Sequence, residues 1–148
     1  MKFEKSVPIA ALQLWDRNPR LHGDQDVPAL VRSIESYGWT NPILVQSRTN
    51  RVIAGHGRIA AAKSMGLTTV PAIFLDLTEQ QASAYTVADN RLAELSQWDV
   101  PLLKDILSEL DGGGFDIGLT GWTEEELANL LHESGSADTV EEGPEPRL

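Results

Sequence analysis

A segment with two glycines, residues 52–62, carries the side chains best suited to chemistry. β-prone residues lead into Gly55-His56-Gly57-Arg58 and alanine-rich sequence follows, so a strand is predicted to turn into a helix here. The first backbone N–H groups of a helix have no acceptor within it and lie at the positive end of its dipole, which favours a phosphate. The segment predicts a phosphate site with Arg58 at its rim. An ordinary tight turn is the alternative.

His56 adds proton-transfer chemistry to this turn. Its imidazole titrates near neutral pH and can donate to a phosphate oxygen, so it is a candidate for both catalysis and phosphate binding. The flanking Gly55 and Gly57 permit positive φ and have no Cβ to block a ligand.

A second polar group, Asp89-Asn90-Arg91, lies late in a predicted helix. Asp89 and Asn90 offer oxygens that suit Mg²⁺, Arg91 suits phosphates, and Asp89 is also a candidate catalytic residue. Consecutive residues spread over roughly 200° of a helix, so at most two of them point at one ligand. A solvated helix end is the alternative.

A third polar cluster begins at Arg17 and ends at His22. Within it, Asn18 and Arg20 are candidate ligand contacts. An ordinary loop is the alternative.

Charge is distributed unevenly along the chain. The net charge of -10 disfavours nucleic acid, but residues 124–148 alone contain eight acids and one arginine. Residues 17–91 contain eight arginines or lysines against six acids. The region of the glycine turn is therefore compatible with a phosphate ligand, although ordinary surface charge would look the same.

Composition narrows the chemistry further. The 148 residues include no cysteine, which removes disulfides, thiolate metal sites and cysteine nucleophiles. No apolar run approaches the roughly 18 residues that cross a bilayer, and the first residues lack the apolar stretch of a signal peptide. We therefore expect a soluble, cytoplasmic protein without membrane association.

Hydrophobic periodicity and capping signals predict an α/β (α+β) fold. Expected strands are 7–12, 42–45, 51–54 and 70–75. Expected helices are 27–38, 58–65, 79–95, 99–112 and 123–132, with capping boxes at Thr78 and Thr123. The predicted domains are residues 1–96, a helical extension over 97–133, and a disordered acidic tail or linker over 134–148.

A set of short motifs resembles the ParB N-terminal-like family of the ParB/sulfiredoxin superfamily over about residues 6 to 95. The motifs are Asn18-Pro19-Arg20, Ser33-Ile34 through Gly38, Asn41-Pro42-Ile43, Ile53 to Arg58 and Ala88 to Ala93. They look especially like the subgroup that accompanies DNA methyltransferases in phages and bacteria. The sequence around Trp98-Asp99, Phe115-Asp116 and Thr120 to Leu127 also looks like that subgroup.

The resemblance implies a small mixed sheet with flanking helices that binds a nucleoside triphosphate, CTP or ATP, with Mg²⁺. In the family's partition proteins, the loop matching residues 55–58 contacts the triphosphate and the helix matching 89–91 helps with Mg²⁺ and phosphates. This chain has His56-Gly57-Arg58 where those proteins have a Glu-Arg-Arg-type box, so neither CTP preference nor CTP hydrolysis carries over. The cysteine that sulfiredoxins require is absent. The helices from Asp99 to His132 look too few and too acidic for a helix-turn-helix domain.

The leading hypothesis is a nucleotide-binding domain that acts in DNA modification or phage DNA metabolism, beside a DNA methyltransferase, with DNA as a further partner. An Asp-Pro-Pro-Tyr motif for methyl transfer is absent. One alternative is a ParB-like nuclease or NTPase that uses His56, Asp89 and His22. A small-molecule kinase would need a second pocket, which nothing in the sequence marks. A partner-binding module with an exposed tryptophan is the remaining alternative.

Overall fold

The computed structural model describes residues 1–17 and 26–133, and the chain divides into two compact units. Unit 1 comprises residues 1–93, and unit 2 begins at residue 94. The predicted acidic tail, 134–148, lies outside the described residues. No helix in the described ranges is both long enough and apolar enough to cross a membrane.

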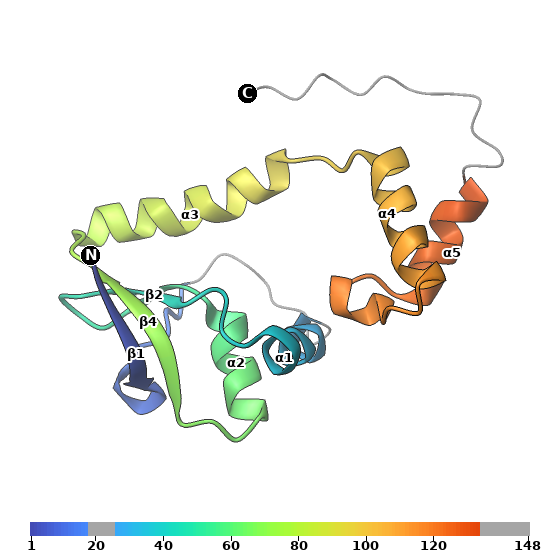
Figure 1. The fold of residues 1–148 in the computed structure, drawn as a ribbon. Helices are drawn as coiled ribbons and strands as arrows, with labels where there is room; N and C mark the ends of the chain where they lie inside the picture. The colour runs from blue at the N-terminus through green and yellow to red at the C-terminus, as the bar shows by residue number, and fades with distance from the viewer. Residues whose placement is uncertain (18–25, 134–148) are drawn as a thin grey trace. The chain divides into compact units, whose positions relative to one another are not determined.

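Unit 1 is built on a four-stranded mixed sheet in the order β1-β4-β2-β3 (Figure 1). β1 (Lys2–Pro8) pairs antiparallel with β4 (Thr69–Leu75), which runs parallel to β2 (Ile43–Gln46). β2 pairs antiparallel with β3 (Val52–Ala54), so the predicted hairpin is confirmed. The expected strand at residues 7–12 is wrong in position, because the strand ends at Pro8 and a 3-10 turn, η1 (Ile9–Ala11), follows.

Three helices accompany the sheet in unit 1. α1 (Asp26–Tyr37) packs against α2 (His56–Ser64), and the two lie side by side in Figure 1. α3 (Glu79–Leu95) starts at the predicted capping box, and its last residues belong to unit 2. In that box the Gln81 N–H donates to Thr78 Oγ1 (3.2 Å) and the Thr78 N–H donates to Gln81 Oε1 (3.0 Å). The mixed α/β fold predicted from the sequence is confirmed.

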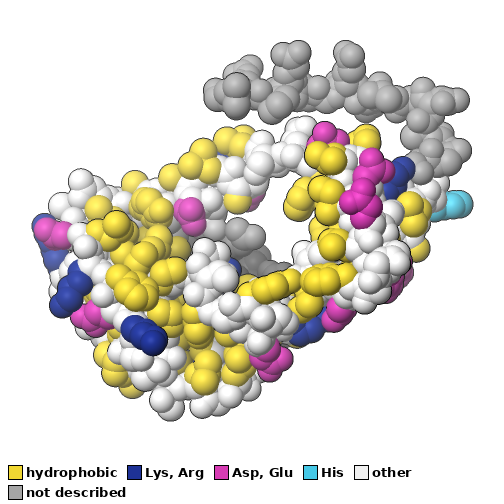
Figure 2. Space-filling view, viewed as in Figure 1, with side chains coloured by type: hydrophobic (Ala, Val, Ile, Leu, Met, Phe, Trp, Pro, Cys, Tyr) yellow, Lys and Arg dark blue, Asp and Glu magenta, His cyan; other side chains and the backbone are white. Residues whose placement is uncertain are grey.

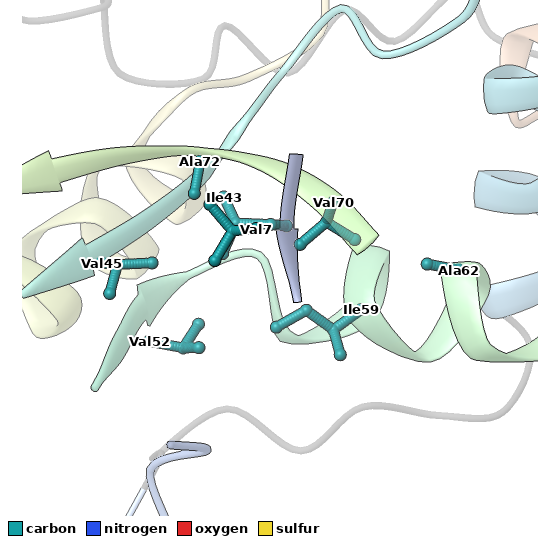
Figure 3. Packing of buried hydrophobic residues seen from close by; sticks show 8 residues of the cluster. All are labelled: Val7, Ile43, Val45, Val52, Ile59, Ala62, Val70 and Ala72. Atoms are coloured by element: carbon teal, nitrogen blue, oxygen red, sulfur yellow. The ribbon is translucent and has the colours of Figure 1, made fainter. Parts of the chain in front are cut away.

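The core of unit 1 lies between the sheet and α2. Apolar side chains from all four strands meet Ile59 and Ala62 of α2 there, as Figure 3 shows. The strand members of this cluster are Val7, Ile43, Val45, Val52, Val70 and Ala72. This packing fixes the end of β3 against the start of α2, which sets the geometry of the glycine turn between them.

Unit 2 is a small helical structure with a core of its own. It contains α4 (Val100–Gly112), a 3-10 turn η2 (Ile117–Thr120) and α5 (Glu124–Glu133). Leu107, Ile117 and Leu127, one from each element, are its buried residues. α4 begins where Asp99 Oδ1 accepts from the Leu102 N–H (3.1 Å), and α5 begins at the second predicted capping box. The Trp98 and Trp122 rings pack in a T-shaped arrangement with their centroids 5.8 Å apart.

The first turn of α5 brings Glu124 close to other acids of unit 2. The pKa of Glu124 is raised above its ordinary 4.5, chiefly by desolvation. Repulsion from Asp111 and a hydrogen bond with it add to this increase, and repulsion from Asp116 adds a smaller part. A raised folded-state pKa adds stability at pH values below the unfolded pKa, and this contribution is lost as the pH rises through the folded pKa. At pH 7 the ionised Glu124 therefore weakens unit 2.

Glu124→Gln is expected to raise the melting temperature of unit 2 at pH 7 by about 1–2 °C, the scale of a surface substitution. The advantage should shrink as the pH falls and wild-type Glu124 becomes protonated. Thermal unfolding from pH 3.5 to 7.5 measures both. Glu125→Gln removes a charge from the same turn and is the matched control. An equal gain in both variants would show that the local environment of Glu124 is not the cause.

Candidate functional site

The glycine turn forms the junction between β3 and α2. Gly55 is the N-cap of α2, with a left-handed φ of 108°, and the Ile59 N–H donates to its carbonyl oxygen (3.0 Å) as the first helical bond. The N–H groups of residues 56–58 therefore precede the intrahelical ladder at the positive end of the helix dipole. The first turn contains no acid, while His56 and Arg58 are half-buried there. Donors, dipole and guanidinium together suit an anion, as the sequence predicts.

Packing is tight at both glycines of the turn, but more so at Gly55 than at Gly57. A Cβ on Gly55 would lie 2.6 Å from Ile43 Cδ1, and one on Gly57 would lie 3.0 Å from Leu30 Cδ1. Gly55 also has a φ that L side chains rarely adopt. Gly55 is thus required by the fold itself, whereas a small shift of the Leu30 side chain would accommodate a Cβ at Gly57. The case for a phosphate site depends on the N–H groups and on Arg58 rather than on the glycines.

His56 is held by the loop that follows η1. Its Nε2 accepts a hydrogen bond from the Trp15 backbone N–H (3.3 Å), so this nitrogen is unprotonated in the bonded state. The loop that contains Gln13 and Trp15 runs along the edge of β3 that no other described strand covers, where the Val52 N–H donates to the Gln13 carbonyl (2.8 Å). This path brings Trp15 to His56. His56 therefore faces the protein at Nε2, and proton abstraction by this atom would require the bond to break.

One face of α3 runs along β3 toward the glycine turn. Ser83 Oγ lies 3.4 Å from the guanidinium of Arg51, the residue before β3, and one turn later Thr86 Oγ1 donates to the Ile53 carbonyl (3.1 Å). Asn90 continues this face, so it lies in the direction of Gly55. Of the three polar residues predicted as a cluster, Asn90 is half-buried, whereas Asp89 and Arg91 are exposed.

The Mg²⁺ site at Asp89 and Asn90 stays a prediction. Among the described residues, no group of three or more His, Asp or Glu side chains is placed to hold a metal ion. Asp89 and Asn90 could contribute oxygens to a Mg²⁺ whose other ligands are waters and phosphates, which is how this ion is usually held. Asn18, Arg20 and His22 lie outside the described residues.

Arg51 and Trp15 form a structural pair that no motif in the sequence marks. The Arg51 guanidinium lies 4.6 Å from the centre of the Trp15 ring, and its Nη1 is 3.0 Å from Glu79 Oε2. These three residues are far apart in the chain, so no local pattern could bring them together. The one feature of the sequence that could have indicated a role for Arg51 is its position directly before a short apolar strand.

Comparison with known proteins identifies the family. The model of the ParB N-terminal domain matches residues 3–91, well over half of the chain, and this chain belongs to that family. The ParB-like nuclease domain-containing protein YnaK of Escherichia coli is 41% identical over 75 residues, which are 50% of this chain and 85% of YnaK. The chromosome-partitioning protein ParB of Myxococcus xanthus is 36% identical over 87 residues, 57% of this chain but only 29% of that protein.

Solved structures agree on the fold. The C-terminally truncated chromosome-partitioning protein ParB from Caulobacter crescentus, complexed with CTP-gamma-S, aligns with a TM-score of 0.72 at 22% identity, covering 93% of this chain and 81% of that one. The same protein complexed to the centromeric parS site aligns with a TM-score of 0.50 at 22% identity, covering 87% and 65% of the two chains. These likenesses place this chain among ParB folds.

The comparisons correct one expectation about unit 2. The model of the ParB-methyltransferase HTH domain matches residues 101–147, so the expectation that these helices do not form a helix-turn-helix domain is wrong. The match also supports the predicted association with methyltransferases. The charge remains unusual, because residues 94–148 contain 14 acids and two basic residues, and acidic side chains gather along α4 in Figure 2. Such a surface repels DNA phosphates.

Proposed function

We propose that this chain is a nucleotide-binding ParB-like protein that works in DNA modification beside a DNA methyltransferase. The phosphates of a nucleoside triphosphate bind the N–H groups at the start of α2, and Arg58 neutralises part of their charge. Asn90, with Asp89, holds a Mg²⁺ ion that bridges the phosphates. Asn18, Arg20 and Arg91 supply further contacts to the nucleotide.

The observation that carries this proposal is the N-terminus of α2. It combines a left-handed Gly55, a first turn without acids and a half-buried Arg58 in one place. The ParB structure with CTP-gamma-S has the same fold, which supports a nucleotide as the ligand. The match of unit 2 to a ParB-methyltransferase domain supports the partner.

Binding without catalysis is favoured over an NTPase or a nuclease. The candidate base, His56, already accepts a hydrogen bond at Nε2, and among the described residues no carboxylates gather as a two-metal site requires. The name of the YnaK relative keeps nuclease activity as the alternative. Mg²⁺-dependent loss of triphosphate or nicking of DNA by the purified chain, abolished in Asp89→Ala, would establish that alternative.

Thermal unfolding with CTP, ATP, GTP, UTP and ADP, each with and without Mg²⁺, tests the nucleotide site. A ligand at about 100 times its dissociation constant adds roughly 2.7 kcal/mol of stability, on the order of 5–10 °C for a chain of this size. The shift should appear with a triphosphate and be lost in Arg58→Ala. That variant removes a cation from the rim while the packing of Gly55 and Gly57 is unchanged.

Arg32→Ala is the matched control, since Arg32 is exposed on α1 and outside the proposed site. It should keep the full nucleotide-induced shift. If no nucleotide shifts the transition of the wild-type chain, with or without DNA, the glycine turn is purely structural and the proposal is wrong.

A further inference from the structure

A pocket of about 500 Å³ opens in unit 1 beside the candidate phosphate site. The loop after η1, the start of β3 and the first turns of α3 form its walls. Its lining residues are Trp15, Arg17, Arg51, Glu79, Gln80 and Ser83. None of them belongs to the glycine turn or to the polar residues 89–91, so the pocket is a separate feature of the surface.

Arg51 forms a fixed, positively charged wall of this pocket. Its side chain is only 12% exposed and is held by the Trp15 ring, by Glu79 and by Ser83 Oγ. Its Nε is buried without a hydrogen-bond partner in the described structure. A buried donor that lacks an acceptor is unfavourable, and such sites are often completed by a water or a ligand. The Arg51 side chain is therefore held in place, while its Nε still lacks a hydrogen-bond acceptor.

The other lining residues add donors in excess of acceptors. Arg17 is exposed and lines the pocket, which brings a second guanidinium to it. Ser83 Oγ accepts from Arg51, which leaves its O–H free to donate. With one carboxylate, Glu79, against two guanidinium groups, the lining has a net charge of +1.

We propose that this pocket binds a small organic anion. Its carboxylate or phosphate group contacts Arg17, whose planar guanidinium matches either anion with two parallel hydrogen bonds. The carbon skeleton of the ligand lies along Trp15. A bare inorganic ion would contact only the arginines of the pocket, whereas an aryl or alkyl anion contacts the arginines and Trp15.

The pocket and the candidate phosphate site share Trp15 as a common wall. The Trp15 ring lines the pocket, while its backbone N–H bonds to His56 Nε2 of the glycine turn. The pocket does not depend on the proposed nucleotide site, because none of its lining side chains is a proposed contact to the nucleotide. The two proposals can therefore fail separately.

Benzoate and phenyl phosphate are suitable probes, and benzamide is the uncharged counterpart of benzoate. Titration of the full ¹⁵N-labelled chain, followed by NMR, should show saturable shifts at the Trp15 indole N–H and at the Ser83 amide with both anions. Benzamide should give no saturable shift. Arg17→Gln should weaken anion binding about tenfold or more, as expected for the loss of a charge-assisted contact.

Two control variants separate this pocket from other anion sites. Arg32→Gln removes an exposed arginine elsewhere and should leave the titration unchanged. Arg58→Ala disrupts the proposed nucleotide site and should leave benzoate binding intact. The proposal is overturned if neither anion gives saturable shifts, if benzamide binds equally well, or if binding is lost in Arg58→Ala and retained in Arg17→Gln.

Discussion

Gly55→Ala is expected to destabilise unit 1 by about 2–5 kcal/mol. A left-handed backbone costs an L residue roughly 1–2 kcal/mol, and an extra methyl group in a packed core costs about 1–3 kcal/mol. The new Cβ would lie 2.6 Å from Ile43 Cδ1, and Ile43 is completely buried and cannot move aside freely. Urea unfolding, followed by near-ultraviolet circular dichroism, measures the loss.

Gly66→Ala is the control that separates backbone strain from packing. Gly66 also has a left-handed φ, of 74°, but a Cβ there would meet nothing within 4 Å. Only the conformational part of the cost, about 1–2 kcal/mol, should remain. Equal losses in the two variants would contradict a packing role for Gly55.

The close packing around Gly55 and Gly57 changes the role that these glycines play in the turn. In the sequence, two glycines before a helix favour a phosphate site because they leave room for a ligand. In the structure, the room at Gly55 is already taken by Ile43 and that at Gly57 by Leu30. The anion-binding capacity comes from what the glycines position, namely the first N–H groups of α2 and Arg58.

Features encoded locally could be predicted from the sequence. Both capping boxes, at Thr78 and Thr123, form the reciprocal hydrogen bonds that their spacing indicates. The β2–β3 hairpin and the helix after the glycine turn have the same origin, because a few consecutive residues determine them. The site residues 55–58 fall within this class.

Features that depend on distant partners could not be predicted in the same way. β1 begins at Lys2, in a polar segment without a strand pattern, because its ladder to β4 and not its own composition stabilises it. The cluster of Trp15, Arg51 and Glu79 joins three separate parts of the chain. For that reason, the pocket that they line could not be predicted from the sequence.

The acidic charge of unit 2 does not exclude a helix-turn-helix fold, as the match over residues 101–147 shows. Net charge reports on solubility and on binding to nucleic acid, but it does not determine a fold. The acids of unit 2 are mostly exposed, whereas its fold depends on Leu107, Ile117 and Leu127. A helix-turn-helix relative can therefore keep its core while its surface becomes acidic. Such a surface is electrostatically unfavourable for contact with DNA phosphates.

Leu127→Ala is expected to unfold unit 2 and leave unit 1 folded. Removing a buried leucine side chain costs about 2–5 kcal/mol. The described part of unit 2, residues 94–133, has a total stability on the order of 2–6 kcal/mol at the usual value per residue. Leu127 is 3% exposed and is one of three buried residues in that core, so the remaining two cannot compensate.

Hydrogen–deuterium exchange resolved by peptide distinguishes the two units. In Leu127→Ala, the amides of α4 and α5 should lose protection, while those of β2, β4 and α2 keep theirs. Leu131→Ala is the control, because Leu131 lies on the same helix but is 48% exposed, and protection should persist throughout. Simultaneous loss of protection in both units of Leu127→Ala would mean that they unfold as one cooperative structure. Independent loss would mean that unit 2 can be disrupted without affecting the glycine turn, and a methyltransferase could then be tested for contact with either unit separately.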